Sequence, residues 1–92
     1  MKKNINYNYV FLFYDIGEDR VNKIFKICKK YLEHYQNSVF CGEITPSNLL
    51  KLENELKKIA IDDDKITILK FINKNVINET ILIGSKPNNK FL

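Results

Sequence analysis

Residues 7–15, Tyr-Asn-Tyr-Val-Phe-Leu-Phe-Tyr-Asp, decide the fold of this chain. The stretch is rich in aromatic and β-branched residues and contains neither Gly nor Pro, so it predicts a β-strand. Successive side chains of a strand point to opposite faces. Apolar side chains therefore occupy both faces of this strand, with Phe11 and Phe13 on one and Val10, Leu12 and Tyr14 on the other. Such a strand is central in its sheet and covered on both sides.

The sequence after this strand alternates between helical and strand patterns. Gly17-Glu18-Asp19 turns the chain, and acidic residues at that point suit the start of a helix. Thr45-Pro46 marks a second helix start, with Thr as the N-cap and Pro at the first helical position. The expected elements are a strand over 7–15, a helix over 19–33, a strand over 35–44 with a kink near Asn37-Ser38 or Gly42, a helix from Thr45 that ends in the loop Asp62-Asp63-Asp64, and strands over 65–72 and 80–84.

This order of elements predicts a two-layer α/β sandwich of the α+β type, in which two helices cover one face of a four-stranded sheet. The second face has no cover within the chain, although residues 7–15 and 66–72 are apolar on both sides. A large bare apolar sheet face is unusual on a soluble monomer. We therefore expect a two-fold homodimer in which sheet packs on sheet.

Length and composition limit the class of protein. The chain has 92 residues, 45% hydrophobic and 28% charged, which predicts a single globular domain over 1–92. No run approaches the roughly 20 apolar residues of a membrane helix. Cys28 and Cys41 are too few for a disulfide framework and suit a reducing cytosol. We therefore expect a cytoplasmic protein, and the composition excludes collagen-like, coiled-coil, secreted and membrane-spanning classes.

Asp15 is the first candidate for chemistry, because it closes an otherwise apolar strand and faces the strand-to-helix turn. Ligand sites in α/β sheets favour the carboxyl ends of strands, although a lone Asp there is often only a turn or cap residue. If the strand lies near a two-fold axis, two Asp15 carboxylates come together, and their repulsion is unfavourable unless a cation or a shared proton relieves it. A hard divalent cation such as Mg²⁺, which keeps several waters, is the natural occupant.

Two charged clusters have both a functional and a structural explanation. Three consecutive acids, Asp62 to Asp64, are possible cation ligands, but such a run in a helix-to-strand loop is more often a solvated turn. The net charge is +4, and Arg20 is the only Arg among fifteen basic residues. The first helix carries Lys23, Lys26, Lys29 and Lys30, which form either a solvated face or a surface that contacts phosphates without reading sequence.

Two motifs tie these residues to a known family. The first is the strand end Phe13-Tyr14-Asp15-Ile16, followed by a basic helix. The second is residues 36–45, Gln-Asn-Ser-Val-Phe-Cys-Gly-Glu-Ile-Thr, which follow the pattern Gln-x-Ser-Val-Phe-x-Gly-x-Leu/Ile-Thr. Together they closely resemble the CRISPR-associated protein two family, the small CRISPR adaptation proteins and endoribonucleases. The resemblance spans residues 8–72 well and the tail loosely.

The resemblance implies a ferredoxin-like fold and a homodimer whose sheets face each other. It implies that residues 77–92 form a C-terminal strand and tail that pack on the partner subunit. It also implies that Asp15 is the catalytic, metal-binding residue with Mg²⁺ as cofactor, flanked by Tyr14 and near Phe40. The side chains expected to contact nucleic acid are all basic: Arg20, Lys23, Lys26 and Lys30.

Two functions of different classes follow. As an enzyme, the dimer would be a metal-dependent endonuclease that cleaves phosphodiesters in single-stranded RNA, with duplex DNA as a substrate in some members. As an architectural protein, it would bridge subunits of the CRISPR integrase and hold a DNA duplex through its lysines during spacer acquisition, without need of Asp15 chemistry. A regulatory module or toxin-type ribonuclease of the same fold is a third, weaker alternative.

Overall fold

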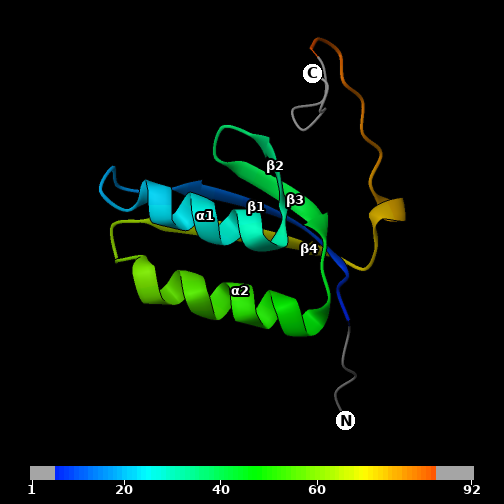
Figure 1. Cartoon of the computed structure of the whole chain (residues 1–92). Helices are drawn as coiled ribbons and strands as arrows, with labels where there is room; N and C mark the ends of the chain where they lie inside the picture. Colours follow the sequence, from blue (N-terminus) through cyan, green and yellow to red (C-terminus); the bar gives the residue numbers. More distant parts are fainter. Residues whose placement is uncertain (1–5, 85–92) are drawn as a thin grey trace.

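The computed structural model describes residues 6–84, which build a four-stranded antiparallel sheet with both helices on one face (Figure 1). The elements in chain order are β1 (Tyr9–Asp15), α1 (Val21–Tyr31), β2 (Glu33–Gln36), β3 (Val39–Glu43), α2 (Pro46–Ile59), β4 (Lys65–Phe71) and the short 3₁₀ helix η1 (Lys74–Val76). The strand order is β2-β3-β1-β4, so β1 lies between β3 and β4. The predicted two-layer sandwich of ferredoxin-like topology is therefore confirmed.

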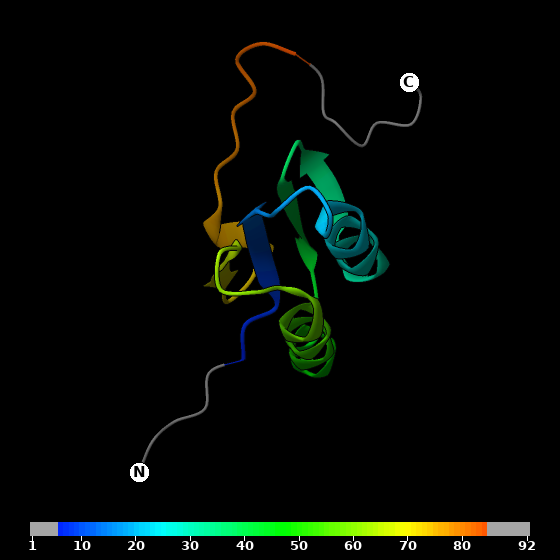
Figure 2. The same ribbon diagram turned by 90° about the vertical axis from the view of Figure 1, so that its left-hand side faces the viewer.

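The core lies between the sheet and the two helices. Val10 and Leu12 of β1 are fully buried, as are Ile24 of α1 and Leu52 of α2. These side chains belong to one cluster that both helices and the sheet share. Figure 2 shows the helices together on one side of the sheet, while the segment after β4 runs on the other side. The second face of the sheet, which the helices leave open, is called the open face below.

The segment 35–44 differs from the prediction of a single strand. The chain forms an antiparallel hairpin here, with β2 and β3 on either side of Asn37-Ser38. Asn37 has a φ of 39°, a left-handed turn conformation that Asn tolerates better than most residues. The kink expected at Asn37-Ser38 is thus a complete reversal. The helix predicted over 19–33 ends at Tyr31, because the backbone of Leu32 is already extended as the chain enters β2.

Helix α2 begins as the sequence predicts. The Thr45 hydroxyl oxygen accepts a hydrogen bond from the Asn48 N–H at 3.2 Å, and Pro46 occupies the first turn. Leu49, Leu52 and Leu56 form its buried face. Among the residues that the structure describes, neither helix is long and apolar enough to cross a membrane.

The strand predicted over 80–84 does not form in the single chain. Leu82 and Ile83 are 88% and 95% exposed, and an extended run becomes a strand only where a neighbouring strand satisfies its hydrogen bonds. The preceding segment instead returns to the open face, where the Tyr35 hydroxyl donates to Glu79 Oε2 at 2.8 Å. That contact covers part of a face expected to be bare. Residues 85–92 lie outside the described residues, and packing of 77–92 on a partner subunit stays a prediction.

Candidate functional site

Asp15 lies at the carboxyl end of β1, and its side chain is exposed. In the antiparallel pair of β1 and β4, Asp15 lies opposite Lys65. On the other side, the Tyr14 N–H donates to the Ser38 carbonyl at 3.1 Å. Because alternate residues of a strand share a face, Asp15 lies on the open face together with Phe13. The structure therefore presents a solvent-accessible carboxylate at the carboxyl end of β1, between β4 and the residues that precede β3.

The open face beside Asp15 is aromatic. The ring of Phe11 is central, with centroid distances of 6.0 Å to Tyr9, 5.9 Å to Tyr35 and 6.3 Å to Phe71. Phe13 and Leu69 on the same face are 39% and 44% exposed. This surface confirms that β1 is apolar on both faces, since its other face is buried under the helices.

Tyr14 and Phe40 face the helices and not the open face. Phe40 is fully buried and Tyr14 is 8% exposed, and their rings stack with centroids 6.2 Å apart. Burial raises the pKa of the Tyr14 hydroxyl. Phe40 therefore lies on the core side of the sheet, against the neighbour of Asp15, and its role near the site stays a prediction.

Arg20, which the resemblance assigns to nucleic-acid contact, is engaged by two carboxylates. Its Nε donates to Asp64 Oδ2 at 2.6 Å, and its Nη2 donates to Asp64 Oδ1 at 2.7 Å. Its Nη1 donates to both oxygens of Asp19, at 2.9 and 3.1 Å. The paired contact with Asp64 requires the planar fork of a guanidinium, which no Lys offers. The structure thus places Arg20 in an ion pair instead of on a free basic surface.

Asp64 makes a contact that the sequence did not predict, since Asp62 to Asp64 were expected to be either cation ligands or a solvated turn. Its side chain is 2% exposed, and it accepts hydrogen bonds from the Gly17 N–H at 2.9 Å and the Ile61 N–H at 3.0 Å as well as from Arg20. The hydrogen bonds from Arg20, and to a lesser extent those from the two backbone N–H groups, hold the pKa of the Asp64 carboxyl well below its usual range. The signal that points to such a contact is the single Arg in a lysine-rich chain. We call Gly17, Arg20 and Asp64 the arginine clamp.

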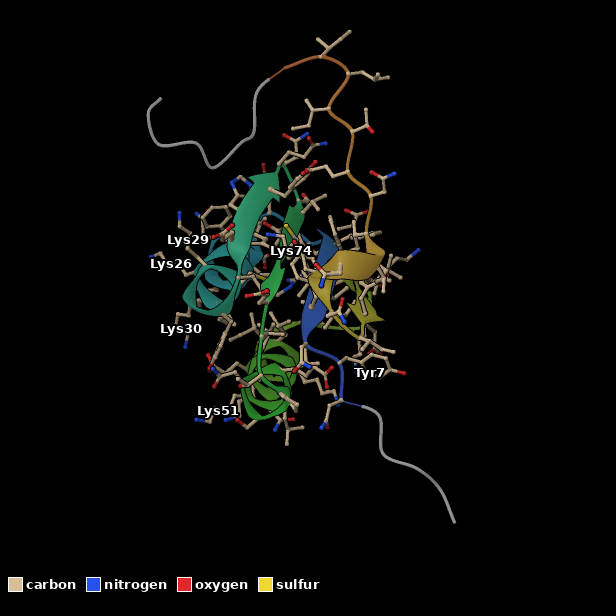
Figure 3. The ribbon with its side chains drawn as sticks, turned by 90° about the vertical axis from the view of Figure 1, so that its right-hand side faces the viewer. Tyr7, Lys26, Lys29, Lys30, Lys51 and Lys74 are labelled. Atoms are coloured by element: carbon tan, nitrogen blue, oxygen red, sulfur yellow. The ribbon has the colours of Figure 1, made fainter. Side chains whose placement is uncertain are left out.

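The lysines of α1 lie on its outer surface. Lys23, Lys26 and Lys29 are exposed. Lys30 pairs with Glu55 of α2, which also accepts a hydrogen bond from Tyr31. Figure 3 shows Lys26, Lys29 and Lys30 along one side of α1, with Lys51 of α2 on the same side of the molecule. We call Lys23, Lys26, Lys29 and Lys51 the basic surface. It holds Lys23 and Lys26 from the expected set, whereas Arg20 and Lys30 are held in ion pairs.

Asp15 is the candidate metal ligand among the residues that the structure describes. Residues 6–84 contain no group of three or more His, Cys, Asp or Glu side chains that could hold a metal ion. Asp62 and Asp63 are exposed, and Asp64 is occupied by Arg20. A Mg²⁺ ion that keeps several waters requires only one or two protein carboxylates. Asp15 is one exposed carboxylate of this kind, and a second would have to come from a two-fold copy of the chain.

Comparison with known proteins identifies relatives of this chain. The model of the family described as "CRISPR associated protein Cas2" matches residues 8–78. The chain is 47% identical to "CRISPR-associated endoribonuclease Cas2 3" of Thermodesulfovibrio yellowstonii, over 76% of this chain and 78% of that protein. It is 39% identical to "CRISPR-associated endoribonuclease Cas2" of Fusobacterium nucleatum, over 89% of this chain and 90% of that protein.

The fold is also that of solved structures. A structure described as "Crystal structure of cas2" superposes with a TM-score of 0.80 and 37% sequence identity, covering 90% of this chain and 93% of that one. The similarity therefore extends over nearly the whole of both chains.

Proposed function

Since the chain belongs to the Cas2 family of CRISPR-associated proteins, we propose that it is a CRISPR adaptation protein with metal-dependent endonuclease activity on single-stranded RNA. The observation that carries the proposal is the exposed Asp15 carboxylate at the end of β1, on a face that the helices leave open. The relatives named as endoribonucleases support the nuclease class. We propose that the protein acts in the cytoplasm.

The proposed active form is a homodimer with open face on open face. Phe13 and Leu69 supply exposed apolar surface for such an interface. β4 is the last strand in the sheet order, so its outer edge is available to a strand from the partner. The exposed apolar residues Leu82 and Ile83 of segment 77–92 have the composition for that pairing. Dimerisation then brings the two Asp15 side chains toward each other.

The residues of the chain have distinct roles in this proposal. The two Asp15 carboxylates hold Mg²⁺ at the interface. When bound, Mg²⁺ supplies activation of water and stabilisation of the charge that develops on the phosphate. The basic surface, which includes Lys23 and Lys26, contacts the phosphodiester backbone. The core-side rings of Tyr14 and Phe40 keep the carboxyl end of β1 in place.

The decisive experiment compares RNA cleavage by the wild type, Asp15→Asn and Asp62→Asn, each with Mg²⁺ and with a chelator. Asp62→Asn is the matched control, because it removes the same charge from an exposed loop. Asp15→Asn should lower the rate by about three orders of magnitude, and the control should behave as wild type. Cleavage retained in rigorously purified Asp15→Asn, or a monomeric mass in light scattering, contradicts the proposal.

A second candidate function is architectural: the dimer bridges subunits of the CRISPR integrase and holds duplex DNA during spacer acquisition. The basic surface favours it, because lysines contact phosphates without reading bases. Duplex binding should weaken steeply with salt, and Lys26→Ala should reduce the slope of log affinity against log salt by about 0.9. Asp15→Asn should leave this binding intact. A flat salt response argues against the architectural function.

A further inference from the structure

We propose that Asp64 is a positioning residue for Asp15, acting through the arginine clamp on the turn that follows β1. This inference rests on the proposed function in one respect only, namely the role of Asp15 as the metal-binding catalytic residue. The physical claim is that the clamp sets the direction of the Asp15 carboxylate. It also reassigns Arg20 from a contact with nucleic acid to a part of this support.

The clamp joins the two chain segments that flank Asp15. Gly17 follows Asp15 by two residues, and its N–H donates to Asp64 at 2.9 Å. Asp64 directly precedes Lys65, the residue opposite Asp15 in the β1–β4 pair. Arg20 spans the same gap, with two hydrogen bonds to Asp64 across 44 positions of sequence. The clamp therefore closes the end of the strand pair at which Asp15 lies.

The turn between Asp15 and α1 is tied internally as well. The Gly17 carbonyl accepts hydrogen bonds from the Arg20 N–H at 2.9 Å and from the Val21 N–H at 3.1 Å. A Cβ atom at position 17 would collide with Arg20 Nη2, so a larger residue there would require the guanidinium to shift from its present position on Asp64. Arg20 thus restrains the turn twice, through its backbone N–H bonded to the Gly17 carbonyl and through its side chain bonded to Asp64.

The Asp15 carboxylate depends on this support. Within residues 6–84 it makes no hydrogen bond or ion pair of its own, so the position of its Cβ and its preferred rotamer depend on the backbone that carries it. The backbone is fixed on one side by the hydrogen bond from Tyr14 to Ser38 and on the other by the pairing with Lys65. The clamp supplies the remaining restraint, at the residues immediately after Asp15.

Burial makes the clamp a rigid support. The Asp64 side chain is 2% exposed and that of Arg20 is 19% exposed, so water competes little for their hydrogen bonds. Such a charge-assisted, two-point contact restricts both groups to one geometry. Catalysis is sensitive to this kind of support, since a displacement of about 1 Å can lower a rate about a hundredfold.

The test uses three variants that break the clamp in different ways. Asp64→Asn keeps the shape and removes the charge, Arg20→Lys keeps the charge and removes the fork, and Gly17→Ala changes no charge but obstructs the guanidinium. Asp62→Asn, on the same loop but exposed, is the matched control.

The first readout is independent of cleavage. Three-bond NMR couplings report the χ1 rotamers of Asp15, and amide hydrogen exchange reports the Gly17 N–H. The wild type and the control should show one dominant Asp15 rotamer. Each of the three clamp variants should spread Asp15 over several rotamers, and Asp64→Asn should speed exchange at Gly17 by about tenfold or more.

The second readout is steady-state cleavage of single-stranded RNA. A positioning role predicts that kcat falls by about tenfold to a hundredfold in each clamp variant while KM changes by less than about twofold. A free phosphate contact predicts a different pattern, in which Arg20→Lys mainly raises KM. Asp62→Asn should match the wild type in both parameters.

The outcomes separate the clamp from the proposed function. Wild-type Asp15 rotamers in Asp64→Asn, together with faster exchange at Gly17, would show a merely structural ion pair and overturn the inference. A KM effect alone in Arg20→Lys would also overturn it. If the wild type does not cleave RNA, the nuclease proposal fails, and the rotamer measurement still decides the clamp. If Asp64→Asn does not fold, the rotamers of Asp15 in Gly17→Ala and Arg20→Lys decide between the two roles.

Discussion

Replacement of Phe40 by Ala tests whether this ring is packed in the core between the sheet and the helices. Phe40 is fully buried, and its ring centroid lies 5.2 Å from Phe25, 5.0 Å from His34 and 6.2 Å from Tyr14. Deletion of such a ring removes buried apolar surface and leaves a cavity, at a cost of about 3–5 kcal/mol. Domains of this size have a total free energy of unfolding of about 5–15 kcal/mol, so the variant should lose a large part of it.

The assay is thermal and urea denaturation followed by circular dichroism. At about 4–8 °C per kcal/mol for a small domain, Phe40→Ala should lower Tm by roughly 12–40 °C. Phe13→Ala is the matched control, because it removes the same ring from the open face, where the side chain is 39% exposed. Within one chain that change should cost about 1 kcal/mol or less.

Protein concentration separates the two faces further. If the open face is a dimer interface, the effect of Phe13→Ala should depend on protein concentration, whereas the effect of Phe40→Ala should not. A loss below about 1 kcal/mol for Phe40→Ala would refute the close packing of this ring between sheet and helices. An equally large, concentration-independent loss for Phe13→Ala would show that the chain itself covers the open face.

Three further results are expected. Thr45→Ala should lower the free energy of unfolding by about 1 kcal/mol in urea denaturation, because it removes the acceptor for the Asn48 N–H at the start of α2. An unchanged urea midpoint would show that this N-cap hydrogen bond does not stabilise the protein. The pKa of Asp64 is lowered in the folded state, so the ion pair stabilises the protein fully above the pKa of an unfolded Asp, about 3.9, and less as pH falls further. The difference in free energy of unfolding between wild type and Asp64→Asn should therefore shrink in acid. A difference that grows in acid would contradict the clamp. Burial raises the pKa of the Cys28 thiol to about 12, so an alkylating reagent at pH 8 should modify Cys28 only as fast as the chain unfolds locally. Rapid labelling of Cys28 in the native protein would refute its burial.

Local pattern determined several elements of this protein. The aromatic run 7–15 has neither Gly nor Pro and is apolar in both alternating sets, which is enough to predict a central strand and a second apolar face. Thr45-Pro46 supplies an N-cap and a first-turn Pro, and α2 begins there. The motifs around Asp15 and over 36–45 were sufficient for the family. These signals act between residues close in sequence, where spacing alone specifies the contact.

Contacts between distant segments were decided by the tertiary structure. The same Asp-rich loop places Asp62 in solvent and Asp64 against Arg20, because only the register of β4 against β1 brings that one carboxylate to Gly17. The face on which Phe40 lies likewise depends on the hairpin that pairs it with Leu12. Residues 80–84 have strand composition but pair with no strand among residues 6–84. A sequence pattern predicts local structure, whereas contacts between residues 44 positions apart, such as Arg20 and Asp64, depend on strand register and on how the elements pack together.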